Sequence, residues 1–138
     1  MPNLRFKITD IEHPELLAYK SMRQMNSDFF IADSLPVVKK LINSKLEIES
    51  IMLTQEMLAN LEGQDIKDIK TFLISKDIQK KIVGHNIHQG IMAKAKTPAN
   101  YTTPDGSPIV CLDGIAKADN VGAIVRNAIG FNVNQILI

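Results

Sequence analysis

Residues 111–138 read CLDGIAKADNVGAIVRNAIGFNVNQILI, and this stretch decides the expected fold of the second half of the chain. It continues a short apolar run, residues 108–112, whose β-branched members are typical of a buried parallel strand. Residues 121–128 then repeat apolar side chains at helical spacing, and residues 131–138 form a second strand-like run. The order strand, helix, strand predicts a βαβ unit.

Turn-forming residues bound the helix of this unit. Asp113-Gly114 ends the first strand, and Asp119 with Asn120 supplies N-cap chemistry before Val121. Gly130 predicts the end of the helix, because glycine is favoured just beyond helix C-termini. We therefore expect a short helix that begins directly after an acidic and polar turn.

Arg126 is the only cation on this predicted helix, and it lies well away from the centre of the apolar stripe. It should project away from the sheet, on the same side as Asp119 and Gly122. By spacing alone, an arginine in this position is typical of a solvated side chain that the helix dipole favours near a helix C-terminus.

The stretch resembles motif 1 of the SpoU or TrmH-like branch of the SPOUT RNA methyltransferases. Three residues depart from the usual form: Asp119 stands where proline is usual, Gly130 where alanine is common and Asn132 where glycine is common. The residues that carry the resemblance are Asp113-Gly114, Ala118-Asp119-Asn120, Gly122, Arg126-Asn127-Ala128 and Phe131.

This resemblance implies a ribose 2′-O-methyltransferase that uses S-adenosylmethionine, with Asn120 and Arg126 as the catalytic residues. Arginine is almost always protonated, so Arg126 is a poor general base. It is better suited to hold the adjoining phosphate and to stabilise negative charge on the ribose oxygen. Asn120 would orient the substrate or Arg126 through its amide.

In the family the cofactor is held by later glycine-rich loops of an α/β knot, through which the enzymes usually form dimers. Those loops do not occur before Ile138, so the resemblance implies no cofactor-binding residue in this chain. We expect the chain to be the front part of such an enzyme and to be inactive alone. Apolar strands without partners would favour a homodimer or other self-association.

Residues 1–96 show alternating strand and helix patterns, which predict a compact α/β layer domain. The expected strands are residues 28–32, 47–53, 71–74 and 90–95. The expected helices begin at Pro14 and run to about Met25, or follow Ser34, Thr54 and Ser75, the last ending at Gly84.

The first domain resembles the substrate-binding domain of many SpoU-type enzymes, which is similar to small RNA-binding ribosomal proteins. Residues 29–54 and 84–93 carry this similarity. Residues 97–107 read TPANYTTPDGS after a lysine and predict a linker. The expected organisation is thus a three-layer RNA-binding domain over residues 1–96, a linker over 97–107, and the first βαβ unit of a methyltransferase domain over 108–138.

The formal net charge of +1 is weak for a nucleic-acid-binding protein, so RNA affinity would have to come from local clusters. His85 and His88 lack further metal ligands nearby, which argues against zinc and favours turn chemistry or RNA contact. The candidate RNA-binding residues are Arg5, Lys20, Arg23, His85, His88 and Lys94.

Composition is that of an ordinary globular protein, with 138 residues and 45% hydrophobic side chains. There is no apolar run long enough to span a membrane and no secretion signal, which favours a cytoplasmic protein without membrane attachment. The single cysteine, Cys111, lies in a predicted strand, where we expect a buried and inert thiol.

Two functional hypotheses follow. The first is an RNA methyltransferase, acting on rRNA or tRNA, whose activity belongs to a longer polypeptide. The second is an independent RNA-binding or interaction module without catalysis. Binding of S-adenosylmethionine and salt-dependent binding of structured RNA would distinguish them.

Overall fold

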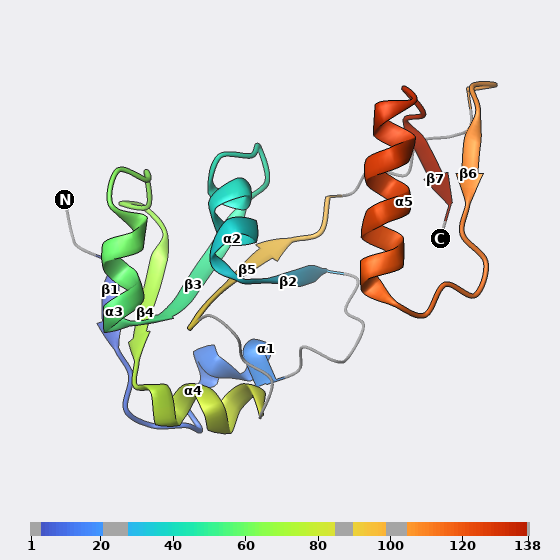
Figure 1. Cartoon of the computed structure of the whole chain (residues 1–138). Coiled ribbons are helices and arrows are strands. Elements are labelled where there is room, and N and C mark those ends of the chain that lie inside the picture. Colours follow the sequence, from blue (N-terminus) through green and yellow to red (C-terminus); the bar gives the residue numbers. More distant parts are fainter. Residues whose placement is uncertain (1–3, 21–27, 85–89, 99–104, 138) are drawn as a thin grey trace. The chain divides into compact units, whose positions relative to one another are not determined.

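The computed structural model describes residues 4–20, 28–84, 90–98 and 105–137. The chain divides into two compact units, Met1–Pro98 and Ala99–Ile138 (Figure 1). In the part of the chain that is described, no helix has the length and apolar character that a membrane crossing requires.

The first unit is built on a five-stranded mixed sheet with the strand order β1-β4-β3-β5-β2. Strands β1, β4 and β3 run parallel, whereas β5 is antiparallel to both β3 and β2. The strands are β1 (Arg5–Lys7), β2 (Phe29–Asp33), β3 (Ile48–Thr54), β4 (Lys70–Ile74) and β5 (Ile91–Lys96).

Short helices cover both faces of this sheet. In Figure 1, α1 and α4 lie on one side of the strands, and α2 and α3 lie on the other. The three-layer α/β arrangement expected for the first domain is therefore confirmed. The helices are η1 (Pro14–Leu16), α1 (Leu17–Lys20), α2 (Leu35–Ile42), α3 (Gln55–Leu58), η2 (Ala59–Leu61) and α4 (Lys76–Val83).

Strand β3 supplies both halves of the core, because its side chains alternate between the two faces. Ile51 and Leu53 are buried in the cluster on the α2 side, which also contains Leu61. Met52 is buried in the cluster on the α1 and α4 side, against Phe72. A strand that is buried on both faces is typical of the centre of an α/β sheet.

A polar pair lies within the second of these clusters. The hydroxyl groups of Tyr19 on α1 and Ser50 on β3 are 2.7 Å apart and form a buried hydrogen bond. Burial raises the pKa of Tyr19 above its ordinary value. The bond satisfies two polar groups that would otherwise be costly to bury, and it joins α1 to the sheet.

Most of the predicted elements of the first unit are confirmed. Helix α4 begins as expected, since Ser75 Oγ accepts a hydrogen bond of 3.2 Å from the backbone N–H of Ile78, and it ends at Gly84 with a φ of 87°. Thr54 precedes α3 but makes no side-chain capping bond. Of the helix expected up to Met25, the structure gives η1 and α1 as far as Lys20, and the rest lies outside the described residues.

Strand β1 was not predicted from the sequence. The sequence predicts Arg5 only as a candidate RNA-binding residue, because three residues of alternating charge and aromatic character give a weak strand signal. The strand forms by parallel pairing with β4 at the edge of the sheet, where Arg5 lies opposite Thr71. Charged side chains are common on edge strands because they discourage further strand pairing.

The second unit consists of β6 (Ile109–Cys111), α5 (Ala118–Gly130) and β7 (Gln135–Leu137). Strands β6 and β7 are parallel, with Val110 opposite Ile136. The predicted βαβ unit is therefore confirmed. The predicted apolar helix face is confirmed as well: Ala128 is buried, and Val121, Ile124 and Val125 are half-buried.

The predicted start of α5 was wrong. The helix begins at Ala118 with Lys117 as its N-cap residue, because the backbone N–H groups of Asn120 and Val121 both donate to the Lys117 carbonyl. Asp119 and Asn120 thus lie in the first turn and are not the cap.

The helix ends at Gly130, as predicted, and closes in a Schellman motif. The N–H of Val133 donates to the Ala128 carbonyl at 2.8 Å, and that of Asn132 donates to the Ile129 carbonyl at 2.9 Å. Asn132 adopts the left-handed conformation, with a φ of 59°. Asparagine tolerates this conformation better than most residues, which explains how it can stand where glycine is common.

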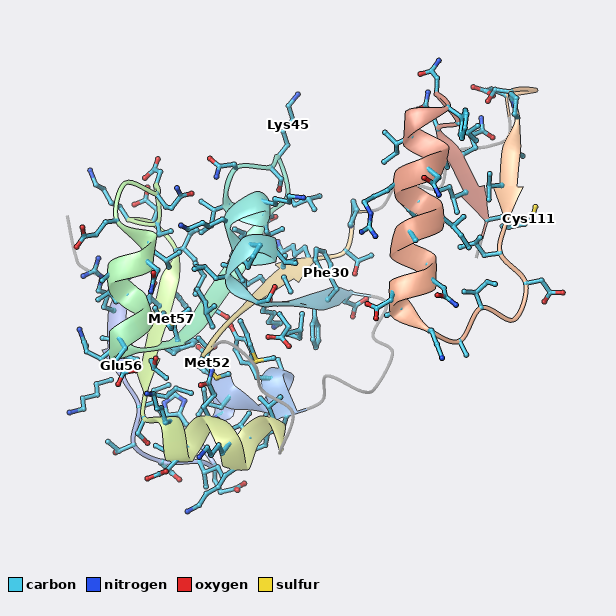
Figure 2. All side chains as sticks on the ribbon, in the orientation of Figure 1. Phe30, Lys45, Met52, Glu56, Met57 and Cys111 are labelled. Atoms are coloured by element: carbon cyan, nitrogen blue, oxygen red, sulfur yellow. The ribbon has the colours of Figure 1, made fainter. Side chains whose placement is uncertain are left out.

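The expectation of a buried Cys111 was also wrong. The thiol is exposed on β6, the strand that carries the label Cys111 in Figure 2. Its neighbours in sequence are Val110, which is half-buried, and Leu112, which is half-buried too. The alternation of exposure shows that one face of this two-stranded sheet packs against α5 and that Cys111 points the other way.

Candidate functional site

Arg126 is exposed on α5, on the side of the helix opposite its apolar face, as predicted. One guanidinium nitrogen lies 3.5 Å from the point that a Cβ of Gly122 would occupy. Side chains of a helix lean toward its N-terminus, so Arg126 extends back over Gly122, one turn earlier. The absence of a side chain at Gly122 leaves the guanidinium accessible along this face.

The first turn of α5 places polar groups at the helix N-terminus. Asp119 shares the face of Arg126 two turns away, and its charge is favourable beside the helix N-terminus. Asn120 is exposed in the same turn. Within residues 105–137, no hydrogen bond or ion pair joins Arg126 to Asp119 or Asn120. The side-chain amide of Asn120 and the guanidinium of Arg126 are thus free to contact a substrate.

A turn with a glycine lies between β6 and α5. Gly114 has a φ of 63°, a left-handed conformation that L residues with a Cβ adopt only at a cost. Open space surrounds the position of its missing side chain. The need for glycine here is therefore conformational, and it explains the Asp113-Gly114 pair of the motif.

Hydrogen bonds attach the segment before β6 to β7. Asp105 Oδ1 accepts from the backbone N–H of Ser107 at 2.9 Å and from Gln135 Nε2. Gln135 Nε2 also donates to Ser107 Oγ at 3.0 Å. Hydrogen bonds from Ser107, and then from Gln135, hold the pKa of Asp105 below its ordinary value. All these groups are polar and none of them belongs to the predicted site.

Two of the basic residues predicted to contact RNA are paired with carboxylates. Lys20 Nζ lies 2.8 Å from Glu12 Oε1. Lys94 Nζ lies 2.7 Å from Glu49 Oε2 and 4.5 Å from the centre of the Phe29 ring. Each of these lysines would have to share or exchange its partner in order to bind a phosphate.

The remaining RNA-binding candidates divide into two groups. Arg23, His85 and His88 lie outside the described residues. Arg5 is exposed on β1 and, within the described part of the chain, forms no ion pair. The structure therefore does not gather the six candidates into one described surface.

Arg5 lines a pocket that was not predicted from the sequence. The pocket has a volume of about 400 Å³ and lies between β1 and the segment from α3 to residue 67. Lys67 and Glu62 also line it. The available signal was the apolar pair Leu61 and Ile66 on either side of Gly63, which anchors a loop to the core.

The described residues contain no group of three or more histidine, cysteine, aspartate or glutamate side chains that could hold a metal ion. Among the described residues of the first unit, five ion pairs join lysines to glutamates. One joins Lys76 to Glu56, which lies on α3 (Figure 2).

Similarity to known proteins is found in both sequence and structure, although no protein-family model matches the chain. A protein of Mycobacterium bovis named uncharacterized tRNA/rRNA methyltransferase is 26% identical over 113 residues, which is 78% of this chain and 39% of that protein. The solved rRNA methyltransferase from Sinorhizobium meliloti matches with a TM-score of 0.72 at 15% identity, over 96% of this chain and 54% of that chain.

Two further structures agree with this match. The Sinorhizobium meliloti enzyme has also been solved with AdoMet bound, and that structure gives a TM-score of 0.71 at 14% identity, with the same coverage. A solved RNA 2′-O ribose methyltransferase gives a TM-score of 0.63 at 16% identity, over 95% of this chain and 54% of that chain.

The resemblance to the TrmH-like RNA methyltransferases is therefore confirmed, and the chain shares the α/β fold of these enzymes. The chain spans about two fifths of the length of the curated relatives that it matches. It spans about half of the solved chains.

Proposed function

We propose that the chain forms part of an S-adenosylmethionine-dependent RNA ribose 2′-O-methyltransferase that acts on rRNA or tRNA. The observation that carries the proposal is the arrangement of motif 1 in the second unit. A left-handed Gly114 leads into α5, and Arg126 stands exposed over Gly122 on the side opposite the packed face. The names and folds of the similar proteins support the same reaction.

In this proposal the two domains have different tasks. Residues 1–96 would bind the RNA substrate, residues 97–107 would link the domains, and residues 108–138 would supply motif 1 of the catalytic domain. The buried core of the first unit supports its role as a rigid platform. An enzyme that modifies cellular RNA would work in the cytoplasm.

The role assigned to Arg126 is electrostatic. As the ribose 2′-hydroxyl loses its proton, negative charge builds on the oxygen, and a guanidinium can stabilise that charge or hold the neighbouring phosphate by paired hydrogen bonds. Asn120 can both donate and accept hydrogen bonds, which suits it to orient the ribose. Neither residue needs to change its protonation state.

The described residues of the second unit do not by themselves fit a bound S-adenosylmethionine. A pocket for a ligand of this size buries most of the ligand surface and therefore needs walls. Among residues 105–137, Ala128 alone is buried. We assign none of them to the cofactor, and Asn120 and Arg126 are assigned to the RNA.

The experiment is a methyl-transfer assay. The chain, and any longer polypeptide encoded in frame with it, would be incubated with methyl-labelled S-adenosylmethionine and structured RNA, and the digested RNA would be analysed for 2′-O-methylnucleosides. We expect Arg126→Ala to lower kcat/KM by roughly 100-fold or more, as for other lost groups that stabilise developing charge. Lys117→Gln, which removes a nearby positive charge at the start of α5, is the matched control.

Arg126→Lys separates the paired hydrogen bonding of a guanidinium from a simple need for positive charge. We expect it to recover only part of the activity, because lysine cannot form the paired hydrogen bonds of a guanidinium. Label in RNA that is not at the ribose 2′-oxygen would contradict the proposed reaction. Full activity of Arg126→Ala would contradict the role of Arg126.

We also propose that the second unit self-associates. Phe131 and Ile129 on the helix end and Leu137 on β7 are 84%, 64% and 63% exposed, which is unusual for large apolar side chains. Among the described residues, no further strand pairs with the outer edges of β6 and β7, so these edges present backbone groups that another strand could bind. Sedimentation should show a dimer whose dissociation is promoted by Phe131→Ser; a wild-type monomer at high protein concentration would contradict this.

A further inference from the structure

We propose that the first unit carries a nucleotide-binding pocket between β1 and the α3–η2 segment, distinct from the motif 1 residues of the second unit. The pocket has a volume of about 400 Å³, which falls in the range of small-molecule sites. Arg5 comes from the edge strand, whereas the other lining residues come from residues 55–67. Two segments distant in sequence therefore build it.

Two positively charged side chains line the pocket, and together they could bind one phosphate group. Arg5 and Lys67 both line it, and neither forms an ion pair with any residue that the structure describes. This distinguishes them from Lys20, Lys70 and Lys94, which are all paired with glutamates. A guanidinium and an ammonium that line one pocket favour a phosphate, since both bind its oxygens through charge-assisted hydrogen bonds.

The other side chains that line the pocket could contact the sugar and the base of a nucleotide. Leu61 and Ile66 are buried members of the core, so that part of the wall is apolar and suits a flat ring. Glu62 can accept hydrogen bonds from ribose hydroxyl groups, which inorganic phosphate lacks. A site for a bare anion would have no use for either feature.

One amide of the pocket is held in a fixed orientation. The side-chain oxygen of Gln64 accepts a hydrogen bond of 2.9 Å from Asn43 Nδ2, and Asn43 Nδ2 also donates to the Lys39 carbonyl at 2.8 Å. The Gln64 oxygen is thus engaged, while its NH₂ group remains able to donate to a base or a phosphate. Asn43 is a positioning residue in this arrangement.

The loop between the two apolar anchors is fixed by the backbone. Gly63 has a φ of 81°, and the N–H of Gln64 donates to the Leu61 carbonyl at 3.0 Å. Glycine is favoured in this conformation, so the sequence selects the turn. A loop that is ordered before the ligand arrives loses less entropy on binding.

The nucleotide could be free in solution or could be an unpaired residue of an RNA strand. The chemistry is the same in both cases: one phosphate, one ribose and one base. The RNA source rests on the proposed function, whereas the free nucleotide does not depend on it.

The test is an NMR titration of the ¹⁵N-labelled 138-residue chain with AMP, UMP, inorganic phosphate and a short single-stranded RNA, each in turn. The variant is Arg5→Gln with Lys67→Gln. The matched control is Lys80→Gln with Lys81→Gln, which removes the same charge from α4 on the other face of the sheet. Dispersed spectra and unchanged melting temperatures would establish that both variants are folded.

We expect AMP, UMP or the RNA to shift the amide signals of Arg5 and residues 58–67. The double variant at Arg5 and Lys67 should weaken this binding by roughly tenfold or more, as for the loss of charge-assisted hydrogen bonds, and the control should leave it within about twofold. Shifts with the RNA but not with AMP or UMP would identify an RNA residue as the ligand and support the pocket.

Three results would overturn the proposal. They are the absence of these shifts with every nucleotide and with RNA, an equal loss of binding in both variants, and inorganic phosphate binding as tightly as AMP. RNA binding that leaves residues 58–67 unshifted would refute the pocket and leave the proposed methyltransferase function in place.

Discussion

The two units of this chain use their apolar side chains in different ways. In the first unit, five consecutive residues of β3, Ser50 to Thr54, are buried between two layers of helices. In the second unit, Ala128 is the one buried residue among those described, and Phe131 and Leu137 are largely exposed. Hydrophobic burial is the main source of folding stability, so the first unit should hold most of it.

Because of this difference in burial, substitutions in the two units should affect different properties of the protein. The motif residues Asn120 and Arg126 are exposed side chains of a helix that packs through its opposite face. Their replacement removes few packing contacts and should change stability little. Residues of the first unit can be expected to behave in the opposite way, with large effects on folding and only indirect effects on reaction chemistry.

The largest expected effect is the loss of core packing in the first unit. Leu53→Ala removes a fully buried side chain from β3 and should lower the free energy of unfolding by about 2–5 kcal/mol. Val110→Ala on β6 removes a half-buried side chain and should cost no more than about 1 kcal/mol. Chemical denaturation of each variant, with hydrogen exchange to assign the losses to each unit, measures both.

Slow exchange should be confined to amides of β3, β4 and β5 in wild type. Leu53→Ala should accelerate these amides and leave those of β6 and β7 unchanged. An equal loss of free energy of unfolding for the two substitutions would contradict this difference between the units, because it would show that the second unit is as tightly packed as the first.

The next effect concerns the buried polar bond of the first unit. Tyr19→Phe leaves the Ser50 hydroxyl buried without its 2.7 Å partner and should destabilise the protein by about 1–2 kcal/mol. Ser50→Ala and the double variant complete a thermodynamic cycle. The double variant should cost less than the sum of the single changes; simple additivity would show that the bond contributes nothing.

The elements that were predicted correctly from the sequence are those whose structure is determined by residues within the same segment. The helical spacing of residues 121–128 indicated both the packed face of α5 and the exposed position of Arg126. The hydroxyl of Ser75 and the conformation of Gly84 act within a few residues, so the bounds of α4 were predicted well. The α/β class followed from the same local patterns.

Prediction from the sequence failed where a strand, a pocket or the exposure of a side chain depends on residues that are distant in the sequence. Strand β1 exists because Arg5 meets Thr71 of β4, and the pocket at Arg5 and Lys67 depends on that pairing. Cys111 lies in a strand, but its exposure depends on which face α5 covers. The pairing of Lys20 and Lys94 with glutamates could not be read from their local sequence either.

A smaller effect is expected at the turn that precedes α5. Gly114→Ala forces a side chain into a φ of 63° and should destabilise the second unit by about 1 kcal/mol, although no atom blocks the new Cβ. Asn132→Gly, at the left-handed position that follows α5, should be neutral or slightly stabilising. Residue-resolved hydrogen exchange measures both changes, and a neutral Gly114→Ala would show that the turn can relax.

The smallest effect is a pH dependence of the second unit. The pKa of Asp105 is lower in the folded state than its ordinary value of 3.8, because Ser107 and then Gln135 donate hydrogen bonds to the carboxylate. The resulting stability is fully present above that ordinary value and is lost as the pH falls through the folded pKa.

Asp105→Asn keeps an acceptor for Ser107 but removes the charge, so it isolates this contribution. Wild type should be slightly more stable than the variant at pH 6, and the gap should close as the pH falls below 3.8 and through the folded pKa of Asp105. Because Asp105 is exposed, solvent screens the interaction and the gap will be small. Hydrogen exchange near β6 and β7 should report it, with β3 unaffected; a gap that persists at pH 2 would show that the carboxylate acts through shape and not through charge.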